Sequence, residues 1–287
     1  MFSADFDYFR ANSVAEAGEL LAKHPGAKLL AGGHSLIPLL KLRLAAPETV
    51  IDIGRITDLR GISVNDQLTI GALSTHADIA SSSEVQQHAT ALADAASQVG
   101  DPAVRNRGTI GGNIAHADPA SDLPTVLVSL GATVTIIGSD GERSVDVADF
   151  FQGVMMTSLG DNDLITSIQI PTASANQATA YAKFSHPASR YAVIGVAVAL
   201  TVTNSTCSAA SVTIGGLVPI PTRCHAVEDA LRGQSLSSTT IATAAAAVTS
   251  NLGDDLLGDV FASAEYRKAV ADVYVRRALT TAAERVK

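Results

Sequence analysis

Two short segments with paired glycines constrain the fold of this 287-residue chain more than any other part of its sequence. The first reads AGGHSL from Ala31 to Leu36 and stands between a predicted strand, Lys28–Ala31, and a predicted helix, Leu36–Leu44. Glycine has no Cβ and tolerates positive φ, so a strand-to-helix turn of this kind can expose several backbone N–H groups. Together with the dipole of the helix that follows, these groups can bind a phosphate without any lysine.

The predicted contacts between this turn and a phosphate come mainly from the backbone. Ser35 adds a hydroxyl, and each hydrogen bond to a charged phosphate contributes about 1.5–3 kcal/mol. For His34 we expect the backbone, rather than the imidazole, to matter most. The candidate binding residues of this segment are Leu30, Ala31, Gly32, Gly33, His34, Ser35 and Leu36.

The second segment reads TIGGN, and its candidate binding residues are Thr109, Ile110, Gly111, Gly112 and Asn113. It follows the basic run Arg105–Arg107, and the sequence predicts a glycine-rich turn with the same chemistry at Gly108–Asn113. A single glycine pair is more often a tight turn or a packing contact, but two pairs favour a site that clamps one diphosphate. Neither segment matches the GxGxxG fingerprint or a P-loop, which excludes a Rossmann domain and a nucleoside triphosphatase.

The remaining pattern of apolar residues predicts an α+β chain. Ser13 is a plausible N-cap of the first helix, with Glu16 completing a capping box. Further strands are expected at Val50–Ile53, Gln67–Ile70, Val134–Ile137, Leu164–Ile170, Tyr191–Thr203 and Ala209–Leu217, the last two as a hairpin joined at Asn204-Ser205-Thr206. Helices are expected at Ser13–Ala22, Val85–Val99, Pro124–Leu130, Cys224–Leu231, Thr239–Leu252 and Ser263–Val286. The segment Pro171–Gln177 is the best candidate for a linker between two domains.

Composition excludes several classes of partner. The formal net charge of -8 and the absence of a Lys/Arg cluster argue against nucleic acid and anionic membranes. The longest apolar run, Ala192–Leu200, is too short for a membrane span, and the N-terminus lacks the features of a signal peptide, so a cytoplasmic location is expected. Cys207 and Cys224 are not part of any cysteine cluster, so we expect them to be packed thiols. His116 and Asp118 are only two potential ligands, too few for the tetrahedral shell of a zinc ion.

The sequence shows no Ser-His-Asp or Cys-His arrangement and no carboxylate pair placed for acid–base catalysis, so the chemistry must come from a cofactor. The sequence resembles the FAD-binding medium subunits of the molybdenum hydroxylase (xanthine oxidase) family. Within that family it is most similar to the aerobic carbon monoxide dehydrogenase type. The resemblance rests on AGGHSLIPLLKLRLAAPETVIDI at 31–53, LTIGALSTHADI at 68–79, DPAVRNRGTIGGNIAHADPASDLP at 101–124, GGLVPIPTRC at 215–224 and AEYRKAVADVYVRRAL at 264–279.

The resemblance implies a p-cresol methylhydroxylase-type FAD-binding domain at residues 1–173, with subdomains at about 1–57 and 58–173. A C-terminal domain with a three-stranded sheet and helices then covers residues 178–287. FAD is expected between the two subdomains, with its pyrophosphate on Ala31–Ser35 and Thr109–Asn113. The resemblance also implies contacts of the cofactor with Asp122, Ile165, Lys183 and Tyr191.

Two of these residues have equally good readings without a cofactor. Lys183 can tune the flavin potential by its positive charge, or it can be an ordinary surface lysine. Tyr191 precedes an apolar strand, so core packing competes with a place beside the isoalloxazine ring. The stretch Ser185–Arg190 departs from the family, in which a basic segment ending in Gly-Asp more often precedes the tyrosine. The departure leaves open which acceptor reoxidises the flavin.

The same resemblance implies an electron-transfer role within a complex. A large subunit with a molybdenum pterin would oxidise the substrate, and a small subunit with two [2Fe-2S] clusters would relay electrons to FAD on this chain. FAD would then pass the electrons to an external acceptor. The complex would be a dimer of heterotrimers, either cytoplasmic or held by its partners at the inner face of the membrane. The alternatives are a self-sufficient FAD-dependent reductase, similar to UDP-N-acetylenolpyruvylglucosamine reductase, and a scaffold subunit that has lost the flavin.

Overall fold

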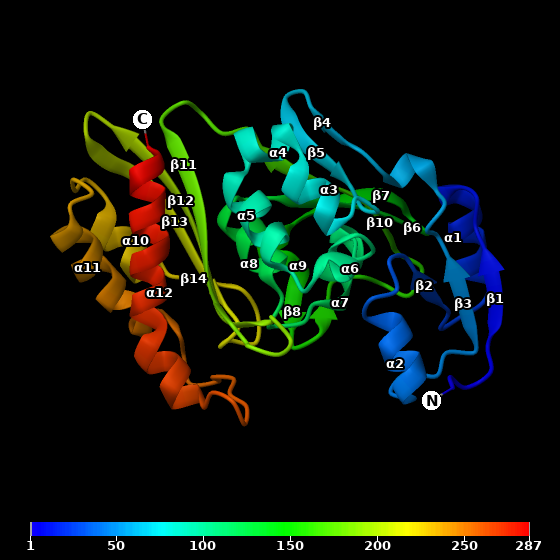
Figure 1. The fold of residues 1–287 in the computed structure, drawn as a ribbon. Helices are drawn as coiled ribbons and strands as arrows, with labels where there is room; N and C mark the ends of the chain where they lie inside the picture. The colour runs from blue at the N-terminus through cyan, green and yellow to red at the C-terminus, as the bar shows by residue number, and fades with distance from the viewer. Residues whose placement is uncertain (1, 287) are drawn as a thin grey trace.

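The computed structural model describes residues 2–286 and shows three layers of structure side by side (Figure 1). At one end lies a small parallel sheet in the order β1-β3-β2. Its strands and neighbouring helices are β1 (Asp7–Arg10), α1 (Val14–Lys23), β2 (Lys28–Leu30), α2 (Leu36–Leu42), β3 (Thr49–Asp52) and the 3-10 helix η1 (Thr57–Leu59). Ser13 caps α1 as predicted, but the carboxylate of Glu16 accepts from the N–H of Asn12 at 2.7 Å, so it does not close a capping box with Ser13.

The middle layer is a five-stranded antiparallel sheet in the order β4-β5-β10-β6-β7, covered by short helices. The strands are β4 (Ile62–Val64), β5 (Gln67–Gly71), β6 (Thr133–Gly138), β7 (Gly141–Asp146) and β10 (Leu164–Pro171), and a separate pair is β8 (Phe151–Gly153) with β9 (Met156–Thr157). The helices are α3 (His76–Ser81), α4 (Ser83–His88), α5 (Thr90–Gln98), α6 (Pro102–Arg105), α7 (Ile110–His116), α8 (Asp122–Ser129) and α9 (Val147–Phe150).

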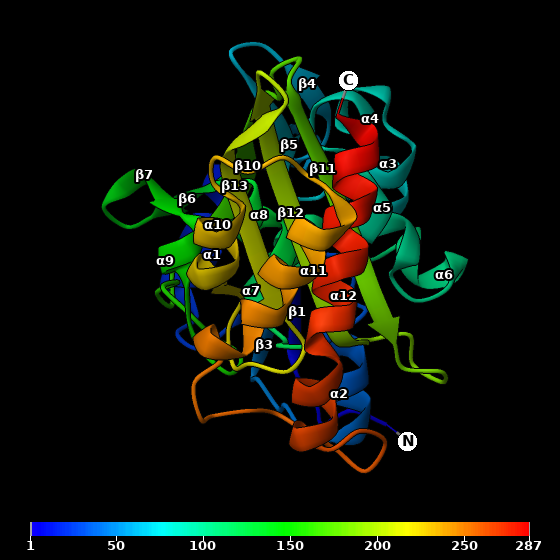
Figure 2. The ribbon, with the colours of Figure 1, turned by 90° about the vertical axis from the view of Figure 1, so that its left-hand side faces the viewer.

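The C-terminal layer is an antiparallel sheet in the order β11-β12-β13-β14. Helices α5 and α8 of the middle layer cover one face, α10 and α12 cover the other, and α11 packs against α10 and α12, as Figures 1 and 2 show from two sides. Because both faces are covered, β12 is buried along most of its length, which explains its unbroken apolar sequence. The elements are β11 (Gln177–Ser185), β12 (Ala192–Thr203), β13 (Thr206–Gly215), β14 (Thr222–Arg223), α10 (His225–Leu231), α11 (Ser238–Ala246), η2 (Ala247–Asn251) and α12 (Ala264–Arg285).

Most predicted elements are present, with differences that have physical causes. The helix expected over Val85–Val99 breaks at Ala89, which is fully buried with φ −146° and ψ 53°. Just after the break, the N–H of Ala91 donates to the hydroxyl of Thr179 on β11, a tertiary contact that replaces a helical hydrogen bond. The helix expected to reach Leu252 ends at Ala246 and continues as η2. The resemblance implied a three-stranded sheet in the C-terminal domain, but the sheet has four strands because the two-residue β14 pairs with β13, and β11 was not among the strands expected from the sequence.

The hairpin between β12 and β13 is confirmed, with a tighter turn than expected. Asn204 and Ser205 both have positive φ, 51° and 62°, which is typical of a two-residue turn whose twist matches that of the strands. The linker predicted at Pro171–Gln177 falls between β10, which ends at Pro171, and β11, which begins at Gln177. One hydrophobic core includes residues of the middle sheet together with Tyr181 and Ala197 of the C-terminal sheet, so the two layers pack tightly.

Candidate cofactor-binding site

The segment from Gly32 to Leu36 forms the strand-to-helix turn that the sequence predicts, between β2 and α2. Gly33 has φ +78°, in the left-handed region that favours glycine. Helix α2 begins without a side-chain cap, and its first backbone hydrogen bond runs from Ile37 to the carbonyl of Gly33. Within residues 2–286, the five backbone N–H groups from Gly32 to Leu36 have no protein acceptor. Five consecutive unpaired donors at a helix start form a nest suited to an anion.

The TIGGN segment has a different structure, and its prediction as a turn is wrong. Ile110 to Asn113 form the first turn of α7, and Thr109 caps it by accepting the N–H of Gly112 at 3.2 Å. The N–H of Ile110 donates to Ser74, and that of Gly111 to Ala72. These backbone donors are therefore already paired, so the two glycine segments do not offer equal numbers of hydrogen bonds to a ligand.

The side chain of Asn113 gives the TIGGN segment a polar contact of its own. Its Oδ1 accepts from the hydroxyl of Ser121 at 2.8 Å, and this bond fixes the orientation of the amide. The Nδ2 group then has no acceptor among the described residues. The Nδ2 amide group of Asn113 is therefore free to donate to a ligand. Through its bond to Ser121, Asn113 also connects the glycine segment with the start of α8.

The two glycine segments lie against each other, although more than 70 residues separate them in sequence. A Cβ atom on Gly32 would collide with the carbonyl oxygen of Arg107 and lie 3.1 Å from the Cα atom of Gly108. On the other side, a Cβ atom on Gly112 would lie 3.9 Å from the Cβ atom of Ala31. The missing side chain at Gly32 thus permits contact between two protein segments, in addition to any approach of a ligand. The two segments are therefore in direct contact.

A buried charge pair lies at the start of α8. Asp122, only 4% exposed, accepts from the hydroxyl of Tyr181 at 2.6 Å through Oδ1 and from Lys183 at 2.8 Å through Oδ2. Lys183 also donates to the carbonyl oxygen of Gln98 at 3.3 Å, and its side chain is fully buried, so the alternative of a surface lysine is wrong. Burial raises the pKa of Asp122, and the neighbouring Lys183 and Tyr181 act against that rise. Burial, followed by the Asp122 charge, raises the pKa of Tyr181 well above its usual value.

Tyr191 lies in the loop directly before β12. Its side chain is 46% exposed, so pure core packing is ruled out as its role. The backbone next to it is fixed, because Ala192 donates to the carbonyl of Ala120 in the loop before α8. Partial burial, then the charges of Asp118 and Asp122, raise the pKa of Tyr191. Tyr191 therefore has an accessible ring close to the buried pair.

Ile165 occupies a more enclosed position than the other candidate residues. It lies on β10, 7% exposed, within the hydrophobic core of the middle layer. The next residue, Thr166, accepts the N–H of Ala72, whose own carbonyl accepts from Gly111. The neighbour of Ile165 is thus connected with the TIGGN segment through Ala72, and a contact of Ile165 itself with a cofactor stays a prediction.

Two polar residues near these segments, Tyr181 and His76, were not expected from the sequence. Tyr181 and Lys183 are two residues apart on β11 and so share a face, which was the available signal. His76 is 3% exposed, its Nδ1 atom has no partner in the described chain, and its ring lies against Gly108. Burial first, then the nearby charges of His34 and Arg105, lower the pKa of His76 to about 4.

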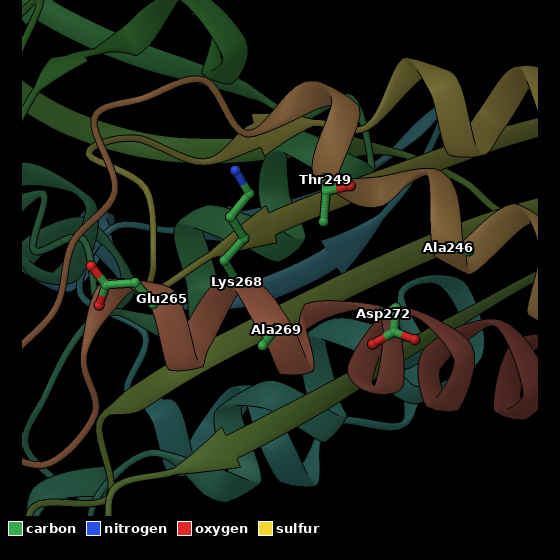
Figure 3. Close-up of a pocket in the computed structure, with 6 residues that line it drawn as sticks. All are labelled: Ala246, Thr249, Glu265, Lys268, Ala269 and Asp272. Carbon is green, nitrogen blue, oxygen red and sulfur yellow. The ribbon is translucent and has the colours of Figure 1, made fainter.

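A groove lies away from this site, between α12 and the α11–η2 segment (Figure 3). Its volume is about 400 Å³, and its lining residues are Ala246, Thr249, Glu265, Lys268, Ala269 and Asp272. These side chains belong to the outer surface of the C-terminal helices, so the groove does not connect with the glycine segments. In the part of the chain that the structure describes, no helix combines the length and the apolar character that crossing a membrane requires.

Comparison with known proteins assigns both parts of the chain. Residues 4–173 match the family described as the FAD binding domain in molybdopterin dehydrogenase, and residues 179–282 match the CO dehydrogenase flavoprotein C-terminal domain. The carbon monoxide dehydrogenase medium chain of Hydrogenophaga pseudoflava is 37% identical over 286 residues, 98% of each chain. Subunit alpha of the 6-hydroxypseudooxynicotine dehydrogenase complex of Paenarthrobacter nicotinovorans is 38% identical and covers 98% of this chain and 96% of that protein. The solved carbon monoxide dehydrogenase of H. pseudoflava superposes with a TM-score of 0.95 at 38% identity, covering 100% of both chains.

Proposed function

We propose, because this chain belongs to the family of FAD-binding medium subunits of molybdenum hydroxylases, that it carries electrons from a [2Fe-2S] subunit through FAD to an external acceptor. The observation that carries the proposal is the nest of five N–H groups from Gly32 to Leu36, which have no acceptor within residues 2–286, next to the segment that leads into α7. When bound, the flavin accepts and releases electrons one or two at a time, which is the chemistry that the chain itself lacks.

The residues of the site fit FAD in an extended arrangement. The nest binds the diphosphate, and at about 1.5–3 kcal/mol for each hydrogen bond to a charged group, a few such bonds suffice for tight binding. Asn113 supports the diphosphate from the TIGGN segment through its free Nδ2 donor. Asp122, Lys183, Tyr191 and Ile165 would hold the isoalloxazine end of the cofactor. This arrangement follows the contact chain Asn113–Ser121–Asp122 from the glycine segments to the buried pair.

The protein side chains at the ring end hold charge and limit access. Lys183 is a buried cation that favours an anionic reduced flavin, because opposite charges attract strongly where water is excluded. Tyr191, at 46% exposure, would contact the bound flavin where the site meets solvent. The departure at Ser185–Arg190 lies directly before Tyr191, so this loop belongs to the edge that an acceptor approaches.

The partners in this proposal are a large molybdenum-pterin subunit and a small [2Fe-2S] subunit, in a dimer of heterotrimers. The curated relatives are named as a medium chain and a complex subunit, which supports a multi-subunit assembly. We propose the carbon monoxide dehydrogenase type, with a cytoplasmic location that is free or held at the membrane by partners. The domain division, 1–173 and 178–287, is part of the same proposal.

Sequence identity alone does not assign the substrate. A relative named for carbon monoxide and one named for 6-hydroxypseudooxynicotine are 37% and 38% identical to this chain. The substrate is oxidised on the large subunit, so a sequence comparison of the medium subunit carries little information about it.

The test is purification of the tagged chain with its partners from the cells that make it. We expect flavin absorption, iron and molybdenum in the complex, and bleaching of the flavin band when carbon monoxide is added anaerobically. Bleaching by an N-heterocycle instead would retain the medium-subunit role and refute the carbon monoxide type. A chain that stays colourless after incubation with FAD would refute the flavoprotein role. Reduction of the isolated flavin-loaded chain by NADPH would show instead a self-sufficient reductase.

A further inference from the structure

We propose that Tyr181 is a positioning residue of the flavin site, whose hydroxyl holds Asp122 as a carboxylate so that Lys183 remains a cation beside the cofactor. The inference rests on the proposed function, since it concerns how this chain sets the charge next to FAD. Tyr181 lies in the C-terminal sheet, whereas Asp122 begins a helix of the middle layer. The hydroxyl therefore connects the two layers at the place where the ring is expected.

The geometry gives each oxygen of Asp122 its own donor. Tyr181 and Lys183 lie on the same face of β11, two residues apart, and they reach Oδ1 and Oδ2 at 2.6 and 2.8 Å. An ammonium group cannot accept a hydrogen bond, so the Lys183 contact uses Oδ2 as an acceptor. Among the described residues, Tyr181 supplies the hydrogen bond to Oδ1. Without this hydroxyl, Oδ1 would be buried with no donor.

The fold makes room for this hydroxyl in a specific way. Lys183 pairs with Gly195 across β11 and β12, and Tyr181 pairs with Ala197. A Cβ atom on Gly195 would collide with the Tyr181 hydroxyl oxygen. The absence of a side chain at Gly195 thus leaves the path along which the hydroxyl reaches Asp122. The tyrosine ring itself packs in the core shared by the two layers, which holds the hydroxyl in one place.

The physical consequence concerns where one proton resides. A buried acid and amine can exist as an ion pair or, after proton transfer from Lys183 to Asp122, as a neutral pair, and the two states lie close in energy because desolvation opposes the Coulomb attraction. A hydrogen bond donated to the carboxylate favours the ion pair. The start of α8 acts in the same direction, because its dipole attracts a negative charge. Tyr181 is thus expected to keep the positive charge on Lys183.

The experiment compares Tyr181→Phe with wild type in the FAD-loaded complex. We expect FAD to remain bound and its midpoint potential to become more negative, because a neutral Lys183 no longer stabilises the reduced anionic flavin. Infrared spectroscopy should show the carbonyl stretch of a protonated carboxylic acid in the Tyr181→Phe protein, and that band should disappear when Asp122→Asn is added. A residue that merely packs would leave both measurements unchanged.

A second variant and a matched control make the test decisive. Gly195→Ala keeps the tyrosine and displaces its hydroxyl, so it should shift the potential in the same direction even if Tyr181→Phe folds poorly. Tyr8→Phe removes a similar bond, 2.5 Å from Tyr8 to Asp52, on the exposed outer strand β1, and should leave the potential unchanged. Wild-type potentials in both site variants would overturn the role of Tyr181. Failure of the wild-type chain to take up FAD would instead overturn the proposed function.

Discussion

Replacing Gly32 by alanine tests whether contact between the two glycine segments is what builds the cofactor site. The added Cβ atom would collide with the carbonyl oxygen of Arg107, a backbone atom that cannot rotate away. Overpacking of this kind costs about 1–3 kcal/mol. The unliganded protein can relieve the strain by separating the two segments, but FAD binding requires them to close. We therefore expect the dissociation constant of FAD to rise roughly 5- to 150-fold, at about 1.4 kcal/mol for each factor of ten.

The assay is titration of the deflavinated protein with FAD, followed by quenching of flavin fluorescence, with thermal unfolding measured in parallel. Gly18→Ala is the matched control, because Gly18 lies within α1 and a Cβ atom there would meet nothing within 4 Å. It should leave FAD affinity unchanged and raise stability by about 0.5–1 kcal/mol through helix propensity. A Gly32→Ala protein that binds FAD as tightly as wild type would show that the contact with Arg107 is not part of the site.

Two further predictions concern stability. Lys183→Met leaves Asp122 buried without its cation and should cost about 3–5 kcal/mol in urea unfolding at neutral pH, and a loss below about 1 kcal/mol would contradict a charged pair. His76 has its pKa lowered to about 4, so the unfolded chain binds a proton before the folded chain does, and stability should fall as pH drops from about 6.5 to about 4. In wild type this lowers the free energy of unfolding by on the order of 3 kcal/mol between these two pH values, and His76→Gln should abolish that loss. A variant whose stability falls equally steeply with acid would refute the assignment of this pH dependence to His76.

Sequence reasoning succeeded where the signal was local. The turn at Gly32-Gly33 was predictable because a strand, two glycines and a helix follow one another, and the left-handed Gly33 agrees with that pattern. Ser13 as a helix cap and the turn at Asn204-Ser205 rest on the same kind of information. In each case the decisive hydrogen bonds and dihedral angles involve residues within a few positions of each other.

Local patterns misled where a distant segment supplied the deciding contact. Gly111 and Gly112 suggested a turn, but this segment is the start of helix α7. The carbonyl groups of Ser74 and Ala72 accept the N–H groups of Ile110 and Gly111 and hold the start of the helix in place. Ala89 breaks a helix that its sequence alone would continue, since the next segment bonds to Thr179. Helix propensity contributes only fractions of a kcal/mol per residue, so one such contact outweighs it.

The sequence by itself determined the family, the cofactor and the strand-to-helix turn at Gly32-Gly33, because these depend on motifs that are contiguous in the chain. Only the tertiary structure decided that Gly32 faces Arg107 and that Tyr181 and Lys183 meet Asp122. The two residues of β11 lie about 60 positions from their partner. Which side chains meet over such separations depends on how sheets and helices pack, and that packing is a property of the whole chain rather than of any one segment.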